Sequence, residues 1–104
     1  MVRKSKYARR QRDLVYLAWI RSLPCLICGS RPAEAAHVGT RAFGQKCSDR
    51  ETFPLCAWDH RVGPHSHHAL GRQFWPHYRL DRAALIRGLN ERYATISNPI
   101  PRSR

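Results

Sequence analysis

The sequence lacks a long hydrophobic run, because none of its apolar stretches approaches the ~20 residues that a helix needs to span a bilayer. The N-terminal segment is basic, but no apolar stretch ending in small residues follows it, as a secretory signal would require. We therefore expect no membrane partner and a cytoplasmic location. Cytoplasmic thiols stay reduced, so disulfide bonds are not the favoured use of the four cysteines.

Acidic residues are also scarce: 7 Asp and Glu stand against 19 Lys and Arg, which gives 104 residues a net charge of +12. Most of these cations are arginine, whose planar guanidinium suits bidentate contact with phosphate. The arginines are scattered along the chain instead of forming the polar face of an amphipathic helix, so nucleic acid is favoured over a membrane surface. We expect DNA as the partner, and RNA stays open because both polymers carry the same backbone charge.

The length predicts one small domain, which we place at residues 13–97 between a basic N-terminal tail (1–12) and a C-terminal tail (98–104). Residues 1–12 carry no acid, and Arg9 and Arg10 would follow a phosphate backbone if the tail is more than a solvated segment. The chain predicts an α+β fold. We expect helices over about 9–22 and 66–72, a helix capped by Asp81, and two antiparallel extended segments at 35–38 and 51–55.

Cysteines have the spacing of a structural zinc site. Cys25 and Cys28 form a Cys-x-x-Cys knuckle, and Cys56 follows the second extended segment. A small domain often needs such a metal to stabilise it. The fourth ligand is either Asp59 or His60, and the sequence leaves both open. Cys47 lies apart from the other three and is interpreted as a free thiol.

Histidines exceed what this zinc site can use: the chain has 6, and a zinc site of this kind takes at most one. Neutral imidazole is a common ligand for divalent cations and the usual general base near neutral pH. Hydrolysis of a phosphodiester needs both, because water must be activated and charge on the phosphate must be neutralised. The surplus of histidines therefore indicates a nuclease.

Four segments in order resemble the HNH endonucleases, in particular the small members encoded by phages and prophages. They are Leu23-Pro24-Cys25-x-x-Cys28-Gly29, Ala35-Ala36-His37-Val38, Asp49 before Pro54-Leu55-Cys56-x-x-x-His60, and His68-x-x-Gly71-x-x-Phe74-Trp75. The similarity covers roughly residues 12–95. It implies a zinc-stapled ββα-metal (His-Me finger) core flanked by an N-terminal and a C-terminal helix, and a bacterial host cytoplasm if the protein is phage-encoded.

The resemblance also implies roles for individual residues. His37 would be the general base, and Asp49 falls where the family usually has an asparagine that braces the base. His60 and His68 would hold a catalytic cation, Mg²⁺ or Mn²⁺, while Cys25, Cys28 and Cys56 would bind zinc, with the fourth ligand, Asp59 or His60, left open. Contacts to nucleic acid are expected from cations around this site and in the tail: Arg41, Lys46, Arg61, Arg9 and Arg10.

Two departures from the family pattern support a second interpretation. Asp59 stands where many relatives have Cys or His, and Ala36 stands where some have a further cation ligand. The alternative is a non-catalytic, zinc-stapled nucleic-acid-binding module, such as a phage recombination or packaging accessory. Two further expectations concern side chains outside the motifs. His65 and His67 are expected on a solvated loop or near phosphate, and the three tryptophans in packed positions.

Overall fold

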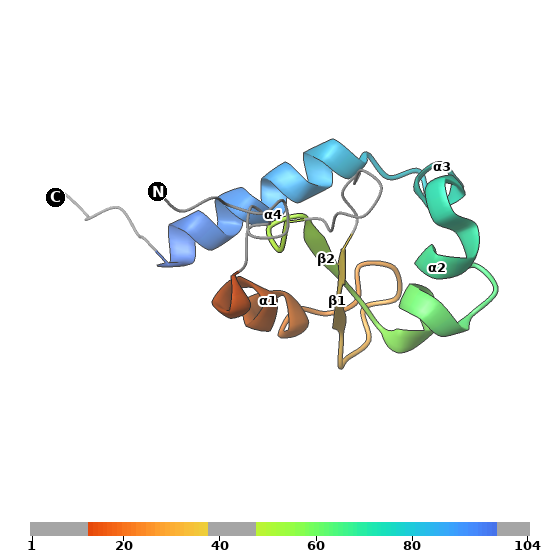
Figure 1. The fold of residues 1–104 in the computed structure, drawn as a ribbon, viewed down its shortest axis with the longest axis horizontal. Coiled ribbons are helices and arrows are strands. Elements are labelled where there is room, and N and C mark those ends of the chain that lie inside the picture. The colour runs from red at the N-terminus through yellow and green to blue at the C-terminus, as the bar shows by residue number, and fades with distance from the viewer. Residues whose placement is uncertain (1–12, 38–47, 98–104) are drawn as a thin grey trace, which may run out of the picture.

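The computed structural model describes residues 13–37 and 48–97. Its centre is a two-stranded antiparallel sheet of β1 (Glu34–His37) and β2 (Thr52–Leu55), in which Glu34 pairs with Leu55 and His37 with Thr52. Helical elements surround the sheet (Figure 1): α1 (Leu14–Arg21), η1 (Trp58–Val62), α2 (His67–Leu70), η2 (Gly71–Gln73), α3 (Phe74–His77) and α4 (Arg82–Ser97). The fold is therefore a small α+β arrangement, as predicted.

Helix α1 begins later than predicted. Asp13 is its N-cap and accepts a hydrogen bond from the backbone N–H of Tyr16 at 3.0 Å, so the helix starts at Leu14. Residues 9–12, where we placed its start, lie outside the described part of the chain. Its buried face carries Tyr16 and Ile20, which are fully buried, whereas Leu14 is 64% exposed.

The chain after β2 forms a π-helical turn, η1, before Gly63 and Pro64 interrupt it. Ser66 caps the next helix by accepting a hydrogen bond from Ala69 N–H at 3.1 Å, which confirms the start predicted near residue 66. The chain turns at 78–79, directly after the short helix α3 (Phe74–His77). Pro76 fits there because the first turn of a helix leaves its N–H groups without intrahelical partners.

Helix α4 is the longest element, with 16 residues, and runs along one side of the molecule (Figure 1). Asp81 caps it as predicted, since its Oδ1 accepts a hydrogen bond from Ala84 N–H at 3.1 Å. Its buried side chains include Leu89 and Tyr93, which are 5% and 9% exposed. Because Leu89 and Tyr93 are four residues apart, both side chains lie on the face of α4 that packs into the core.

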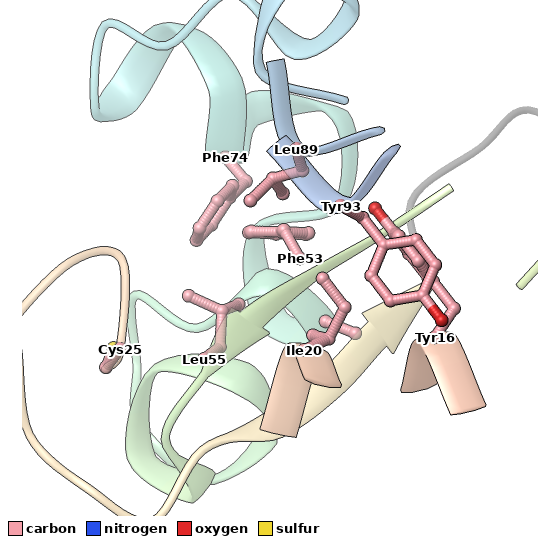
Figure 2. Packing of buried hydrophobic residues seen from close by; sticks show 9 residues of the cluster. Tyr16, Ile20, Cys25, Phe53, Leu55, Phe74, Leu89 and Tyr93 are labelled. Atoms are coloured by element: carbon pink, nitrogen blue, oxygen red, sulfur yellow. The ribbon is translucent and has the colours of Figure 1, made fainter. Parts of the chain in front are cut away.

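The core lies where the two flanking helices meet the sheet. Figure 2 shows side chains from different elements converging there: Tyr16, Ile20, Phe53, Leu55, Phe74, Leu89 and Tyr93. The ring of Tyr16 meets that of Tyr93 edge-on at a centroid distance of 4.8 Å, and Phe53 lies 5.9 Å from Phe74. This packing fixes α1 and α4 against the strands that carry the candidate site residues. None of the helices in the described ranges combines the length and apolar character that crossing a bilayer requires.

Candidate functional site

Three thiols and one carboxylate meet beside the sheet. The ligand atoms of Cys25, Cys28, Cys56 and Asp59 all lie within 4.8 Å of one another. Asp59 Oδ2 lies 3.3 Å from the Cys25 sulfur and 3.4 Å from the Cys56 sulfur, and the sulfurs of Cys28 and Cys56 are 3.7 Å apart. The structure therefore assembles a cluster compatible with a structural metal ion, and it groups Asp59, not His60, with the thiols.

Local backbone hydrogen bonds create this cluster. Cys25 N–H donates to Ser30 O at 2.9 Å and Gly29 N–H donates to Cys25 O at 2.8 Å, closing the knuckle on itself. Gly29 has a φ of +76°, a conformation that residues with a Cβ rarely adopt. Leu26 N–H then donates to Pro54 O at 2.9 Å, which joins the knuckle to β2 two residues before Cys56.

The donor set fits a thiophilic cation. Burial raises the pKa of the Cys25 thiol to about 11, whereas the hydrogen bond with Ser30 lowers the pKa of Cys28. A buried thiol with a raised pKa loses its proton readily only when a cation stabilises the thiolate. Three sulfur ligands with one carboxylate match the ligand types that zinc accepts in tetrahedral sites.

His37 and Asp49 form the second group. The Nε2 atom of His37, at the end of β1, lies 2.9 Å from Oδ1 of Asp49. Asp49 is completely buried, while the His37 side chain is 35% exposed. The second oxygen of Asp49 accepts a hydrogen bond from Asp13 N–H at 2.9 Å, and its carbonyl accepts one from Thr52 Oγ1. A rigid carboxylate thus holds one nitrogen of a partly exposed imidazole.

Asp13 and Arg50 support this pair, and sequence reasoning missed both. Arg50 Nε donates to Asp13 Oδ2 at 3.0 Å, and its guanidinium lies 4.7 Å from the Tyr16 ring centroid. Asn90 of α4 donates from its side-chain amide to Arg50 O at 3.0 Å. Asp13 stands before an apolar helix, so its capping role was detectable from sequence. Its contact with Asp49 was not.

Glu34, His60 and Arg61 form a third group. Glu34 Oε1 lies 2.7 Å from His60 Nδ1 and accepts from Arg61 Nε at 3.0 Å, while Oε2 accepts from Arg61 Nη2 at 2.8 Å. The hydrogen bonds from Arg61 and His60 lower the pKa of Glu34 to about 2. Burial lowers the pKa of His60, which favours the neutral imidazole. The ring of His68 lies 4.7 Å from that of His60.

This third group changes the environment expected for two residues. Arg61, predicted to contact nucleic acid, forms a bidentate ion pair with Glu34, and its contact with phosphate stays a prediction. Because His60 bonds Glu34 through Nδ1, its Nε2 is the atom left to bind a cation. Sequence reasoning did not identify Glu34, although a carboxylate is a common partner for a ligating histidine.

The two histidine groups lie on opposite faces of β1. Glu34 and His37 are three residues apart, and side chains in a strand alternate between faces. In the described ranges the sheet has only two strands, so the outer edge of β1 has no strand partner there.

The environments predicted for His67 and Trp58 were wrong. His67 lies in α2, not on a solvated loop, and packs against Phe53, Phe74 and Trp75 at centroid distances of 5.7, 5.2 and 5.9 Å. Burial lowers its pKa to about 4. Trp58, expected to be packed, is 59% exposed because the turn of η1 directs Asp59 inward to the thiols instead.

The remaining predictions concern His65 and five residues outside the described part of the chain. His65 is exposed, as expected, and stacks on His77 with their ring centroids 4.9 Å apart. Four predicted nucleic-acid contacts and one thiol fall outside the described residues: Arg9, Arg10, Arg41, Lys46 and Cys47. Their assignments therefore stay predictions.

Comparison with known proteins identifies a family. Residues 2–85 match the family described as "Protein of unknown function (DUF968)". The chain belongs to this DUF968 family. No curated protein and no solved structure matches it significantly. The family description names no activity, so the function has to be argued from the side chains of this DUF968 protein.

Proposed function

We propose that this DUF968 protein is a metal-dependent endonuclease of the HNH type that hydrolyses phosphodiester bonds in DNA. The observation that carries the proposal is the pair His37–Asp49, a partly exposed imidazole held at 2.9 Å by a fully buried carboxylate. Such a pairing fixes the tautomer and orientation of a general base. It stands at the end of a strand in a small, strongly basic protein.

His37 would act through Nδ1. Its Nε2 faces Asp49, so a proton on Nε2 leaves the lone pair of Nδ1 available to take a proton from water. The imidazolium formed in this step is stabilised by the carboxylate behind it. No hydrogen bond to His37 Nδ1 exists among residues 13–37 and 48–97, which is consistent with a base that meets its proton donor only when substrate is bound.

His60 and His68 would hold the catalytic cation, Mg²⁺ or Mn²⁺. When bound, such a cation neutralises charge on the scissile phosphate and on the leaving oxygen. Glu34 holds His60 through Nδ1, so Nε2 is presented in the neutral, ligating form. Two imidazoles leave the remaining positions to water and to substrate phosphate, the ligands that Mg²⁺ commonly keeps.

The zinc site, held by Cys25, Cys28, Cys56 and Asp59, would have a structural role. It ties the knuckle before β1 to the turn after β2, and His60 follows Asp59 directly. Fixing Asp59 therefore fixes the backbone that carries His60. The net charge of +12 supplies the attraction to the phosphate backbone, with Arg9, Arg10, Arg41, Lys46 and Arg61 as the predicted contacts.

Plasmid relaxation tests the proposal. Purified wild type, His37→Ala and His77→Ala are compared with Mg²⁺, with Mn²⁺ and with EDTA. His77 serves as the control. It is an exposed histidine that stacks on His65 and, among residues 13–37 and 48–97, forms no hydrogen bond with either histidine group. We expect metal-dependent nicking by the wild type and by His77→Ala, a loss of at least tenfold in His37→Ala, and equal DNA binding by all three.

The alternative is a zinc-stapled module that binds nucleic acid without cleaving it. It would give no nicking of plasmid, branched or single-stranded DNA under any metal, together with intact, salt-sensitive binding. Cleavage that survives His37→Ala would contradict the role of His37 as the general base.

A further inference from the structure

Trp58 presents an indole to solvent at the start of η1, the turn that carries Asp59 and His60. It is 59% exposed, an unusual position for the largest apolar side chain. The two residues that follow it, Asp59 and His60, belong to the metal cluster and to the Glu34 group respectively. Val62, one turn further along η1, is also 59% exposed. The turn that carries Asp59 and His60 therefore also exposes two apolar side chains to solvent.

Gly63 holds this indole in place. A Cβ at Gly63 would lie 2.7 Å from Cε2 and Nε1 of Trp58 and 3.0 Å from Cδ2. Two of these atoms form the ring fusion, so the backbone of Gly63 lies over the ring and not at its edge. Gly63 N–H also donates to Trp58 O at 2.8 Å. One face of the indole is thus covered by backbone, and the exposed area belongs to the rest of the ring.

We infer that Trp58 is a stacking platform for one unpaired nucleobase next to the scissile phosphate. An indole with an open face stacks on any base, because every base has a π-face. The charge of +12 makes a polyanion the favoured partner for an exposed ring on this protein. Buried bases of an intact duplex cannot reach such a ring. The inference rests on the proposed function and assigns a preference for nucleic acid with unpaired bases near the cut.

Binding measurements test this without cleavage. In a His37→Ala background, fluorescence anisotropy gives the affinity for a labelled single-stranded thymine oligonucleotide and for a labelled blunt duplex. We expect Trp58→Ala to weaken binding of the single strand by about 5- to 100-fold and binding of the blunt duplex by less than about twofold. Ile96→Ala is the matched control, since Ile96 is also 59% exposed but lies on α4.

Gly63→Ala gives an independent second variant. The φ of −77° at Gly63 suits alanine, so the added Cβ displaces the indole without straining the backbone. We expect it to reproduce the selective loss for single strands while its circular dichroism and zinc content stay those of the parent. Stacking adds no ionic contact, so the salt dependence of binding should not change in either variant.

The outcomes separate this inference from the nuclease proposal. Equal losses on both oligonucleotides in Trp58→Ala, or no loss on either, would overturn the stacking role even if the wild type nicks plasmid. A selective loss on single strands would support it even if the wild type cleaves nothing. Binding of Trp58→Ala that matches Ile96→Ala on single strands would also contradict it.

Discussion

The backbone N–H of Asp13 donates a hydrogen bond to Oδ2 of Asp49, 36 residues away in sequence, over 2.9 Å. The other oxygen of Asp49 faces His37 Nε2 at the same distance. Both oxygens of this buried carboxylate are therefore used as acceptors, one for the base and one for the start of α1. Asp13 also caps α1 and pairs with Arg50, so the N-terminus of the helix and the candidate base share one network.

Replacing Asp49 by asparagine tests this network. An amide has one acceptor and one donor end, so Asp49→Asn either points its N–H₂ at Asp13 N–H or presents a donor to His37 Nε2. The first leaves buried donors facing each other, and the second imposes the wrong tautomer on His37. We expect a loss of about 1–3 kcal/mol in the free energy of unfolding, measured by urea denaturation, and slower nicking. Wild-type stability together with wild-type nicking would contradict this account.

Asp13→Ala separates capping from support of the base. Both Asp13 and Asp81 cap helices with their side chains, so Asp13→Ala and Asp81→Ala should each cost about 1 kcal/mol of unfolding free energy. Of the two caps, only Asp13 also pairs through its side chain with Arg50, while its backbone N–H, which alanine keeps, donates to Asp49. We therefore expect the nicking rate, with its pH dependence, to change in Asp13→Ala and to stay at the wild-type level in Asp81→Ala. Equal nicking rates in the two variants would exclude a role for Asp13 beyond capping.

Glu34→Gln should weaken the binding of the catalytic cation. The carboxylate holds His60 Nδ1 at 2.7 Å and is itself held by Arg61. Losing such a partner typically lowers metal affinity by about 10- to 100-fold. We expect the Mn²⁺ concentration for half-maximal nicking to rise by this factor with zinc content unchanged. Glu91→Gln, an exposed carboxylate on α4, should leave it unaltered; a matching rise there would indicate a general charge effect.

Removing a residue of the thiol–carboxylate cluster should reduce zinc binding, whereas removing Cys47 should not. Cys56→Ser and Asp59→Ala each remove one of the clustered ligands, so we expect less than one equivalent of zinc by native mass spectrometry and a lower melting temperature. Cys47→Ser, at the cysteine that the sequence sets apart, should retain full zinc. A strong chelator should lower the melting temperature of the wild type. Full zinc in Asp59→Ala would instead make His60 the fourth ligand.

Tyr16→Phe should stabilise the fold or leave it unchanged. The Tyr16 hydroxyl is buried and has no hydrogen-bond partner in the described ranges. Removing it relieves a desolvation cost of about 1 kcal/mol, which urea denaturation would detect. A loss of more than 1 kcal/mol would show that the hydroxyl has a partner.

The raised pKa of Tyr16 predicts that the stability of the fold depends on pH. Burial raises the pKa of Tyr16 from 10.0 to about 12, so its hydroxyl ionises in the unfolded chain before the folded one. Its contribution to stability is complete below pH 10 and declines as the pH rises toward 12. The difference in unfolding free energy between Tyr16→Phe and wild type should therefore grow in favour of phenylalanine over that interval. A constant difference would contradict the raised pKa.

Several local features were predictable from sequence alone. The knuckle at Cys25 and Cys28, the strand ending at His37 and the cap at Asp81 each depend on residues a few positions apart. Short-range spacing, turn chemistry and capping determine such features, and the structure contains all three.

Tertiary structure alone decided the rest. The sequence left Asp59 and His60 open as the fourth zinc ligand. In the structure, the η1 turn directs Asp59 toward the thiols, and His60 contacts Glu34, 26 residues away. The exposure of Trp58 and the burial of His67 likewise depend on which face of a turn or helix meets β2 and α3. The sequence by itself determined which chemical groups this DUF968 protein has and the local turns that carry them. Packing between distant segments decided which of those groups meet, because neither a side chain's direction nor its burial is encoded by its immediate neighbours.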